Sequence, residues 1–192
     1  MTLKEYYINY NYSLHQLADQ FPLPSHISIE GRLFGVPENL EQIRIGQKYY
    51  VESLEFANDF EAVKKILAVY YQPLYFDCIF DIDKSIQFET IIENIDSFEA
   101  IPVAKHLFEE IHKLQEKESE NLSQKRTNQQ IAAGIGKLDK YGSFGTIDML
   151  AGGDPLKYES ISQLSWSIAF LKLKLEKDRS DYEKNLSEIM RK

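Results

Sequence analysis

The spacing of apolar residues along the chain predicts mainly helices. A first helix of about four or five turns is expected between Thr2 and Pro22, because Thr2 and Glu5 can form a capping box. Its apolar positions are Leu3, Tyr6, Tyr7, Tyr10, Leu14 and Leu17. Residues 26–34 alternate between apolar and polar, and prolines lie on both sides of them, so this segment predicts a short strand or a hairpin.

Further helices are expected in the middle of the chain. Residues 41–56 fit a helix loosely, and the pattern also allows extended backbone at the start of this segment. The clearest pattern is residues 60–72, with Asp59 as the N-cap and an end before Pro73. Residues 75–80 are expected to form a short strand or a buried loop. Asp83 is then expected to cap a helix that runs to about residue 95.

The second half of the chain predicts two longer helices with a glycine-rich segment between them. A helix that starts at Ser97 is expected to pack along one side, and its apolar pattern ends at the polar run of residues 116–126. Thr127 and Gln130 form a second capping box, which opens a short helix weakened by glycines. Residues 141–158 hold closely spaced glycines and a proline, and they are expected to form a hinge or a docking loop.

The C-terminal segment predicts one long helix over residues 161–190, opened by a third capping box of Ser160 and Gln163. Its seam follows heptad spacing and is interrupted at Asp178: Ile161, Leu164, Ile168, Leu171, Leu175 and Tyr182. Trp166, Phe170 and Leu173 broaden the apolar face of its first half, so we expect the part up to about Leu175 to pack on the body. The part from Tyr182 to Met190 is expected to be exposed or bound to a neighbour.

These elements predict a mainly α fold, a multi-helix bundle with a minor short β-hairpin and a long C-terminal helix. Two regions are expected. Residues 1–126 form an acidic, mostly helical part, and residues 127–192 hold the glycine-rich segment and the long helix. One continuous domain is equally compatible with the 192-residue length.

Charge and composition limit the functional classes. Residues 1–100 hold 7 basic and 16 acidic residues, a net charge of −9, whereas residues 101–192 hold 15 and 14, a net charge of +1. Neither half offers the basic stripe that phosphates require, so no direct sequence-specific nucleic-acid partner is expected. No apolar stretch is long enough for a membrane span, and the N-terminus lacks a secretory apolar region, which predicts no membrane partner and a cytosolic site of synthesis.

Motifs for catalysis or metal binding do not emerge. His106 and His112 are six residues apart and point to nearly opposite sides of a helix, and the segment between them lacks the zinc-protease spacing. Gly134–Lys137 lacks the other residues of a phosphate loop, and Asp77, Asp81 and Asp83 lack calcium-loop spacing. Cys78 is the single cysteine and is expected to be a buried, inert thiol. We therefore expect no catalytic residue, no cofactor and no metal, and a protein that is not an enzyme.

Several segments resemble small assembly proteins of tailed bacteriophages: MTLKEYY, IRIGQKYYVESL, FEAVKKILAVYYQPLYFD, IPVAKHLFEEI and KYGSFGTIDMLAGGDPLKYESISQL. The resemblance is to tail, neck and tail-assembly-chaperone proteins of phages that infect Bacteroidetes, including the crAss-like group. It covers much of residues 38–175 and rests on overall pattern, without a diagnostic motif. It implies a non-enzymatic protein, made in the bacterial host cytoplasm, that binds other phage proteins.

Two forms of that role are open. The chain is either a virion subunit in a homo-oligomeric ring at the portal, neck or tail, or a cytosolic chaperone that shields tail proteins before assembly. We favour the ring, in which each subunit presents one surface and accepts another. A host-encoded helical adaptor and a small enzyme are the alternatives from other classes.

Contact residues for such docking can be suggested from the sequence. Nine of the twelve tyrosines lie in the first 75 residues, and tyrosine suits both protein contact surfaces and the edges of a core. The expected contact groups are Tyr49, Tyr50, Tyr70, Tyr71, Tyr182, Leu186 and Ile189, with residues 141–158 adapting to an axial partner. For each single tyrosine in the first 75 residues, a place in the monomer core remains open.

Overall fold

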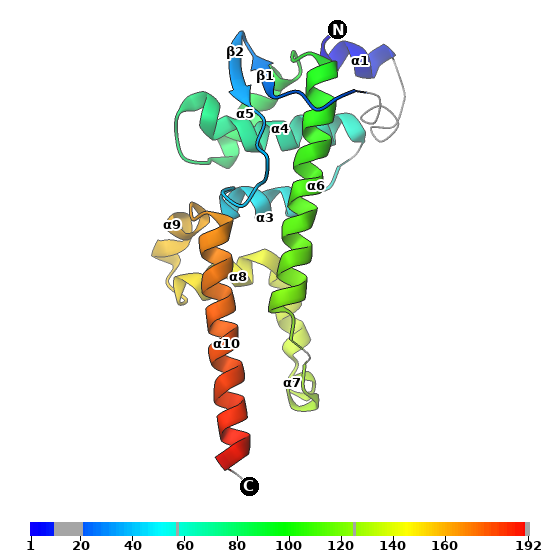
Figure 1. Cartoon of the computed structure of the whole chain (residues 1–192). Coiled ribbons are helices and arrows are strands. Elements are labelled where there is room, and N and C mark those ends of the chain that lie inside the picture. Colours follow the sequence, from blue (N-terminus) through cyan, green and yellow to red (C-terminus); the bar gives the residue numbers. More distant parts are fainter. Residues whose placement is uncertain (10–20, 57, 125, 191–192) are drawn as a thin grey trace.

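Helices make up most of the molecule in the computed structural model, which describes residues 1–9, 21–56, 58–124 and 126–190 (Figure 1). The predicted mainly α class, with a small hairpin and a long C-terminal helix, is confirmed. The first-half elements are α1 (Leu3–Asn9), β1 (His26–Ile29), β2 (Arg32–Gly35), α3 (Ile45–Ser53), α4 (Asp59–Phe76) and α5 (Ile82–Ile92). The second-half elements are α6 (Ser97–Leu122), α7 (Asn128–Ala132), the 3-10 helix η1 (Ile135–Tyr141), α8 (Gly142–Ala151), the 3-10 helix η2 (Pro155–Lys157), α9 (Tyr158–Ser162) and α10 (Trp166–Met190).

Helix α6 runs along most of the molecule and is the element around which the others are arranged (Figure 1). Around its N-terminal half lie α1, the hairpin, α4 and α5. Beside its C-terminal half lies α10, with α8 crossing near both, and the C-terminus is at the opposite end of the molecule from the N-terminus. The molecule is therefore elongated, with a wide helical body and a narrow end formed by α10 and α7.

The core is formed where α4 and α6 cross. Val63, Leu67 and Tyr71 of α4 are fully buried, as are Val103 and Leu107 of α6. The cluster also contains Ile27 and Ile29 from the hairpin and Trp166 and Ala169 from α10. Residues of both expected regions therefore share one hydrophobic cluster.

Two of the three predicted capping boxes form. Thr2 and Glu5 form the expected capping box, with the Glu5 carboxylate accepting from the Thr2 N–H at 2.9 Å and the Thr2 hydroxyl from the Glu5 N–H at 3.2 Å. Thr127 and Gln130 form the second one. Two caps differ by one or two positions, because Asn58 and Asp81, rather than Asp59 and Asp83, accept the first free backbone N–H groups. Of the first helix, positions 10–20, including Leu14 and Leu17, lie outside the described residues.

Helix α4 was predicted to end before Pro73. This is wrong, because the helix continues to Phe76. A proline inside a helix leaves the carbonyl four residues earlier without its backbone donor. Here that carbonyl belongs to Val69, and the side-chain amide of Gln47 on α3 donates to it at 2.7 Å. A side chain from another helix thus replaces the missing backbone donor. The predicted strand or loop at 75–80 is instead the end of α4 and a turn, in which Asp77 has a positive φ of 50°.

Residues 141–158 are also different from the expectation. They form α8, η2 and the start of α9 rather than an open loop, and Gly152 and Gly153 form the turn after α8, with φ values of 67° and 75°. Docking of this segment to a partner stays a prediction. The third capping box does not form, because the side-chain amide of Gln163 binds the backbone of Phe80 instead. Its amide N–H donates to the Phe80 carbonyl at 3.0 Å, and its amide oxygen accepts from the Phe80 N–H at 3.2 Å. The long helix consequently begins at Trp166 instead of residue 161.

Candidate interaction surface

Helix α10 has two apolar stripes in its N-terminal half, and only one of them packs on the body. Trp166, Ala169 and Leu173 are 1%, 2% and 7% exposed. Phe170 is partly buried and stacks on Trp166 with ring centroids 4.8 Å apart. The packed stripe therefore ends at Leu173, about two turns into the 25-residue helix.

Polar contacts fix this stripe against α3 and α6. The Trp166 indole N–H donates to the Glu118 carboxylate at 2.5 Å, and the Trp166 backbone N–H donates to the carbonyl of Ile43 at 2.7 Å. One turn beyond Leu173, the Lys177 ammonium donates to the carbonyl of Asn121 at 2.7 Å, near the C-terminal end of α6. The rotation of α10 about its axis is set by these contacts.

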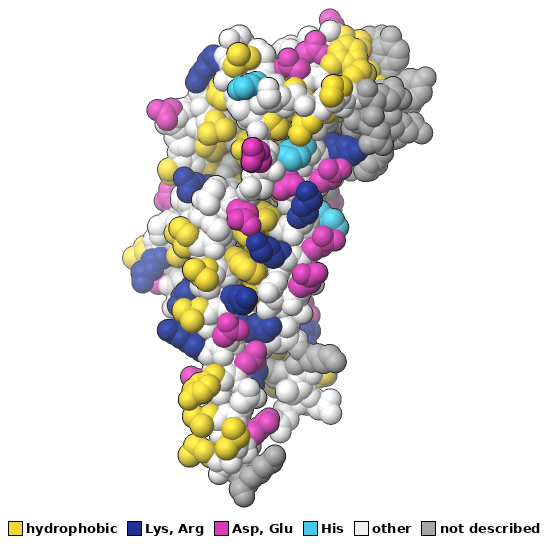
Figure 2. All heavy atoms as spheres, viewed as in Figure 1, with side chains coloured by type: hydrophobic (Ala, Val, Ile, Leu, Met, Phe, Trp, Pro, Cys, Tyr) yellow, Lys and Arg dark blue, Asp and Glu magenta, His cyan; other side chains and the backbone are white. Residues whose placement is uncertain are grey.

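The opposite stripe of α10 is exposed, and we call it the α10 stripe. It follows heptad spacing with two polar positions between its apolar ones: Ile168, Leu171, Leu175, Asp178, Tyr182, Asn185 and Ile189. Leu171, Tyr182 and Ile189 are 68%, 65% and 70% exposed. Leu186 and Met190 lie beside it and are exposed as well. Figure 2 shows hydrophobic side chains gathered at the narrow end of the molecule, where α10 projects.

The expected packing of α10 is therefore corrected in its first half. The whole apolar face up to about Leu175 was expected to pack on the body. This is confirmed for Trp166 and Leu173, which are buried, and wrong for Ile168, Leu171 and Leu175, which are exposed. The second half agrees with the expectation of exposure: Tyr182, Leu186 and Ile189 are all exposed. Their role as contact groups stays a prediction.

The four tyrosines of the first half that were suggested as contact groups lie in or beside the core. Tyr71 is completely buried and Tyr49 is 8% exposed, so neither can be a contact group on the surface of this fold, which corrects the expectation for these two. Tyr50 and Tyr70 are half-buried. Burial raises the pKa of Tyr70 to about 12 and raises the pKa of Tyr49 and of Tyr71 further above the usual value, with the Glu118 charge adding to the effect at Tyr49.

A buried lysine lies where α3, α6 and α10 meet. The side chain of Lys48 on α3 is 0% exposed, and its ammonium lies 2.5 Å from Glu52 and 2.9 Å from Glu118. Glu118 also accepts the Trp166 indole N–H, so α3, α6 and α10 meet at one carboxylate. Sequence reasoning missed this group, because a lysine between Gln47 and Tyr49 gives no local signal of burial.

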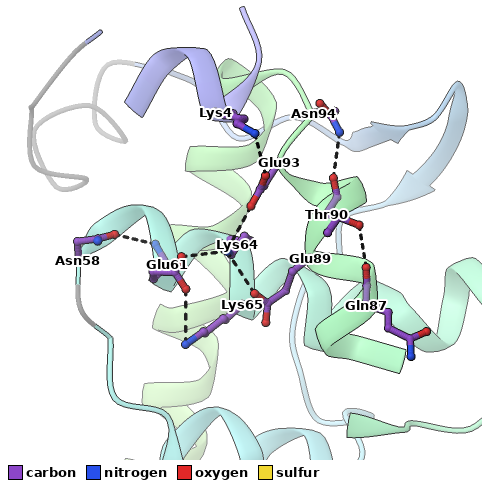
Figure 3. A network of polar contacts seen from close by, with 10 residues as sticks. All are labelled: Lys4, Asn58, Glu61, Lys64, Lys65, Gln87, Glu89, Thr90, Glu93 and Asn94. Atoms are coloured by element: carbon purple, nitrogen blue, oxygen red, sulfur yellow. Dashed lines mark hydrogen bonds and ion pairs between the residues drawn. The ribbon is translucent and has the colours of Figure 1, made fainter. Parts of the chain in front are cut away.

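A second ion cluster joins α1, α4 and α5 (Figure 3). The Lys64 ammonium lies 2.9 Å from Glu61, 3.3 Å from Glu89 and 3.4 Å from Glu93, and Lys4 reaches Glu93 at 3.6 Å. The hydrogen bond and charge of Lys64 hold the pKa of Glu61 below its usual value. Since each acid of the cluster faces an ammonium, the arrangement links helices and offers no carboxylate poised for proton transfer.

A surface hollow of the body lies beside the C-terminal end of α4. It has a volume of about 520 Å³ and is lined by Arg44, Gln47, Tyr70, Cys78 and Gln163 among others. Both glutamines are already bound to the backbone of other elements. The Cys78 thiol is partly exposed, not buried as expected, and accepts from the Gln72 amide at 3.1 Å.

The histidines of the described chain lie apart. His106 contacts the carbonyl of Pro37 at 2.7 Å, while His112 is exposed on α6 beside Glu116. His26 contacts the hydroxyl of Ser25 at 3.0 Å, and His15 lies outside the described residues. Across residues 1–9, 21–56, 58–124 and 126–190, no group of three or more His, Cys, Asp or Glu side chains is placed to hold a metal ion.

Comparisons with known proteins give no relative. No family model matches the sequence, no curated protein matches it, and no solved structure matches the fold. None of the described helices is long and apolar enough to cross a membrane.

Proposed function

We propose that this chain acts by docking to other protein chains and that the α10 stripe is its principal docking surface. The observation that carries the proposal is the exposure of a heptad-spaced apolar stripe on a helix that projects beyond the body. A surface helix normally turns its apolar face to the core, whereas α10 exposes this one along its whole length. Large apolar residues exposed along one face of a helix in this way are typical of protein interaction sites.

The far end of α10 supports the same conclusion. Every residue from Tyr182 to Met190 is exposed, so this part of the helix gains no stability from packing within the chain. Isolated helical segments of this length are marginal in water, and most helical stability in proteins comes from tertiary packing. A partner that covers the stripe would supply that packing.

The particular role that we propose follows the resemblance to phage assembly proteins. The chain would be a non-enzymatic subunit of a ring at the portal, neck or tail of a phage virion, bound to copies of itself and to portal or tail proteins. A closed ring needs two different surfaces on each subunit. The second surface available is the segment from α8 to η2, where Phe144, Met149 and Leu156 are 50%, 56% and 91% exposed.

Mass spectrometry of phage particles purified from the cells that make this chain tests the role. A virion subunit is expected at a stoichiometry of several copies per particle. If the chain is abundant in the lysate but missing from particles, the alternative is favoured, a cytosolic chaperone that shields tail proteins before assembly. Absence of the chain from both particles and complexes with tail proteins would contradict both forms.

A pair of variants separates the α10 stripe from general surface effects. Ile189→Glu places a charge on the stripe, and Ile86→Glu places the same charge on α5, where the isoleucine is 50% exposed. Both residues are exposed, so both variants should fold like the parent chain. We expect only Ile189→Glu to lower the amount of the chain in particles. Equal incorporation of the two variants would contradict docking through the stripe.

A further inference from the structure

The α10 stripe is complementary to itself, and we propose that it binds the α10 stripe of a second copy of this chain in an antiparallel coiled coil. This inference rests on the proposed docking role of the stripe and adds the identity and direction of the partner. The seam lies opposite Leu173 and Lys177, the side of α10 that packs on α3 and α6. A second helix can therefore lie along the seam without meeting the body of either copy.

The order of residues along the seam selects one register. When the twofold axis crosses the helices at the level of Ser180, Leu171 faces the partner's Ile189, and Asp178 faces the partner's Tyr182. The tyrosine hydroxyl can then donate to the carboxylate, so that the acidic seam position gains a hydrogen-bond donor. Leu175 faces the partner's Asn185, a polar contact of the kind that costs stability and fixes register.

Neighbouring registers are worse. A shift of the pairing by seven residues toward the N-terminus places Asp178 against the partner's Leu175 and Asn185 against the partner's Ile168. This shift buries two polar groups against aliphatic side chains. The opposite shift places Asp178 against the partner's Ile189, which buries a carboxylate against an aliphatic side chain.

The flanking charges also favour the antiparallel arrangement. In the register centred at Ser180, Lys174 lies beside the partner's Glu188, and symmetry forms this pair twice. Arg179 and Asp181 lie beside their own equivalents near the axis, but each is paired within its own chain, Arg179 with Glu176 and Asp181 with Lys184. The seam thus has opposite charges at its ends and locally neutralised charges at its centre.

A parallel coiled coil is disfavoured by the same residues. In register, it would place Asp178 against the partner's Asp178 inside the seam and Lys174 beside the partner's Arg179. Both contacts bring like charges together, and the first of them does so in a partly desolvated place. The antiparallel dimer uses the same surface on both copies, so it closes after two copies. A ring needs a further contact between two different surfaces, and the dimer contact would add to that one.

Sedimentation equilibrium of the full chain tests the self-association. We expect a dimer at micromolar concentrations and at least about a hundredfold weaker dimerisation for Leu171→Glu, because symmetry places the substitution in two layers. The control Ile86→Glu should dimerise like the parent chain. A parent chain that stays monomeric, or a Leu171→Glu dimer as stable as that of the parent, would overturn the inference.

A charge exchange tests the register. Lys174→Glu and Glu188→Lys should each weaken the dimer about three- to tenfold, because each creates two like-charge contacts. The double variant should return to within about twofold of the parent chain. Additive losses in the double variant would overturn this register.

Engineered cysteines test the direction. In a Cys78→Ser chain, Asp178→Cys and Tyr182→Cys made separately should form a disulfide between the two kinds of chain when they are mixed and oxidised. Asp178→Cys alone should form little disulfide in the antiparallel dimer and much in a parallel one, so efficient linkage of that variant to itself would overturn the proposed direction. If the chain is monomeric but is found in virions through the α10 stripe, this inference fails while the proposed function stands.

Discussion

The buried ammonium of Lys48 offers the sharpest test of how α10 is held. Its side chain is 0% exposed, and it separates the carboxylates of Glu52 and Glu118, at 2.5 and 2.9 Å. Lys48→Met keeps most of the volume of the side chain and removes the charge. The two carboxylates would then face each other without a counterion, at the point where α3, α6 and α10 meet.

The size of the effect follows from the exposure of the three groups. Removal of one partner from a buried ion pair costs about 3–5 kcal/mol. The carboxylate side chains are 19% and 20% exposed, so water reaches them in part, and we expect the lower end, about 3 kcal/mol. At about 2–4 °C per kcal/mol for a chain of this size, the melting temperature should fall by roughly 6–12 °C.

Tryptophan fluorescence during urea unfolding measures this change directly. Trp166 is the single tryptophan of the chain and donates to Glu118, so its emission reports the junction itself. Lys157→Met is the matched control, because Lys157 is 61% exposed and forms an ion pair with Asp154 at 3.2 Å; we expect a change below about 1 kcal/mol.

A charge-balanced variant completes the test. The triple variant Lys48→Met, Glu52→Gln, Glu118→Gln should be more stable than Lys48→Met alone, because it removes the uncompensated charges as well as the ammonium. If Lys48→Met unfolds at the same urea concentration as Lys157→Met, the junction does not depend on the buried ammonium and the reasoning is refuted.

Three other predictions concern packing, the backbone of α4 and alkaline pH. Gly46→Ala should cost about 1–3 kcal/mol, because its Cβ would lie 3.0 Å from α9, whereas Gly35→Ala meets nothing within 4 Å and should show no such clash in urea unfolding. Gln47→Leu should cost about 1–3 kcal/mol by leaving a buried carbonyl unpaired, and Pro73→Ala in the same chain should recover part of this loss by restoring the backbone donor; no recovery would contradict the assigned role. The pKa of Tyr70 in the folded state, about 12, lies above its value of about 10 in the unfolded chain. The contribution of Tyr70 to stability is therefore complete below about pH 10 and is lost as the pH rises toward 12. Between pH 10 and pH 12, Tyr70→Phe should lose less stability than the parent chain.

Two capping boxes and the hairpin were predicted correctly, because their causes act within a few residues. The capping boxes at Thr2 and Thr127 form because each involves a side chain and a backbone group three residues apart. The hairpin of residues 26–35 also follows from its alternation, with Ile27 and Ile29 buried and their neighbours more exposed. In these places the local pattern contains the full physical cause.

The extension of α4 through Pro73 shows what local patterns omit. The proline removes a donor, and sequence reasoning correctly treats that loss as a reason to stop the helix. The compensating amide comes from Gln47, which lies on α3 and 22 residues before the carbonyl of Val69 that it binds. No window around Pro73 contains that donor, so the end of the helix depends on the tertiary structure.

The face of α10 that packs on the body is decided by the same kind of distant contact. Both stripes of the helix are apolar near its start, and heptad spacing alone favours the stripe that begins at Ile168. The other stripe contains Trp166, which offers more area to bury and an indole N–H that Glu118 accepts from α6. Since one helix cannot turn both stripes to one body, burial of the tryptophan stripe leaves the heptad stripe exposed. The regular spacing that resembled a core is thus available for a second chain, and sedimentation equilibrium of the parent chain and of Leu171→Glu decides whether that chain is another copy of this one.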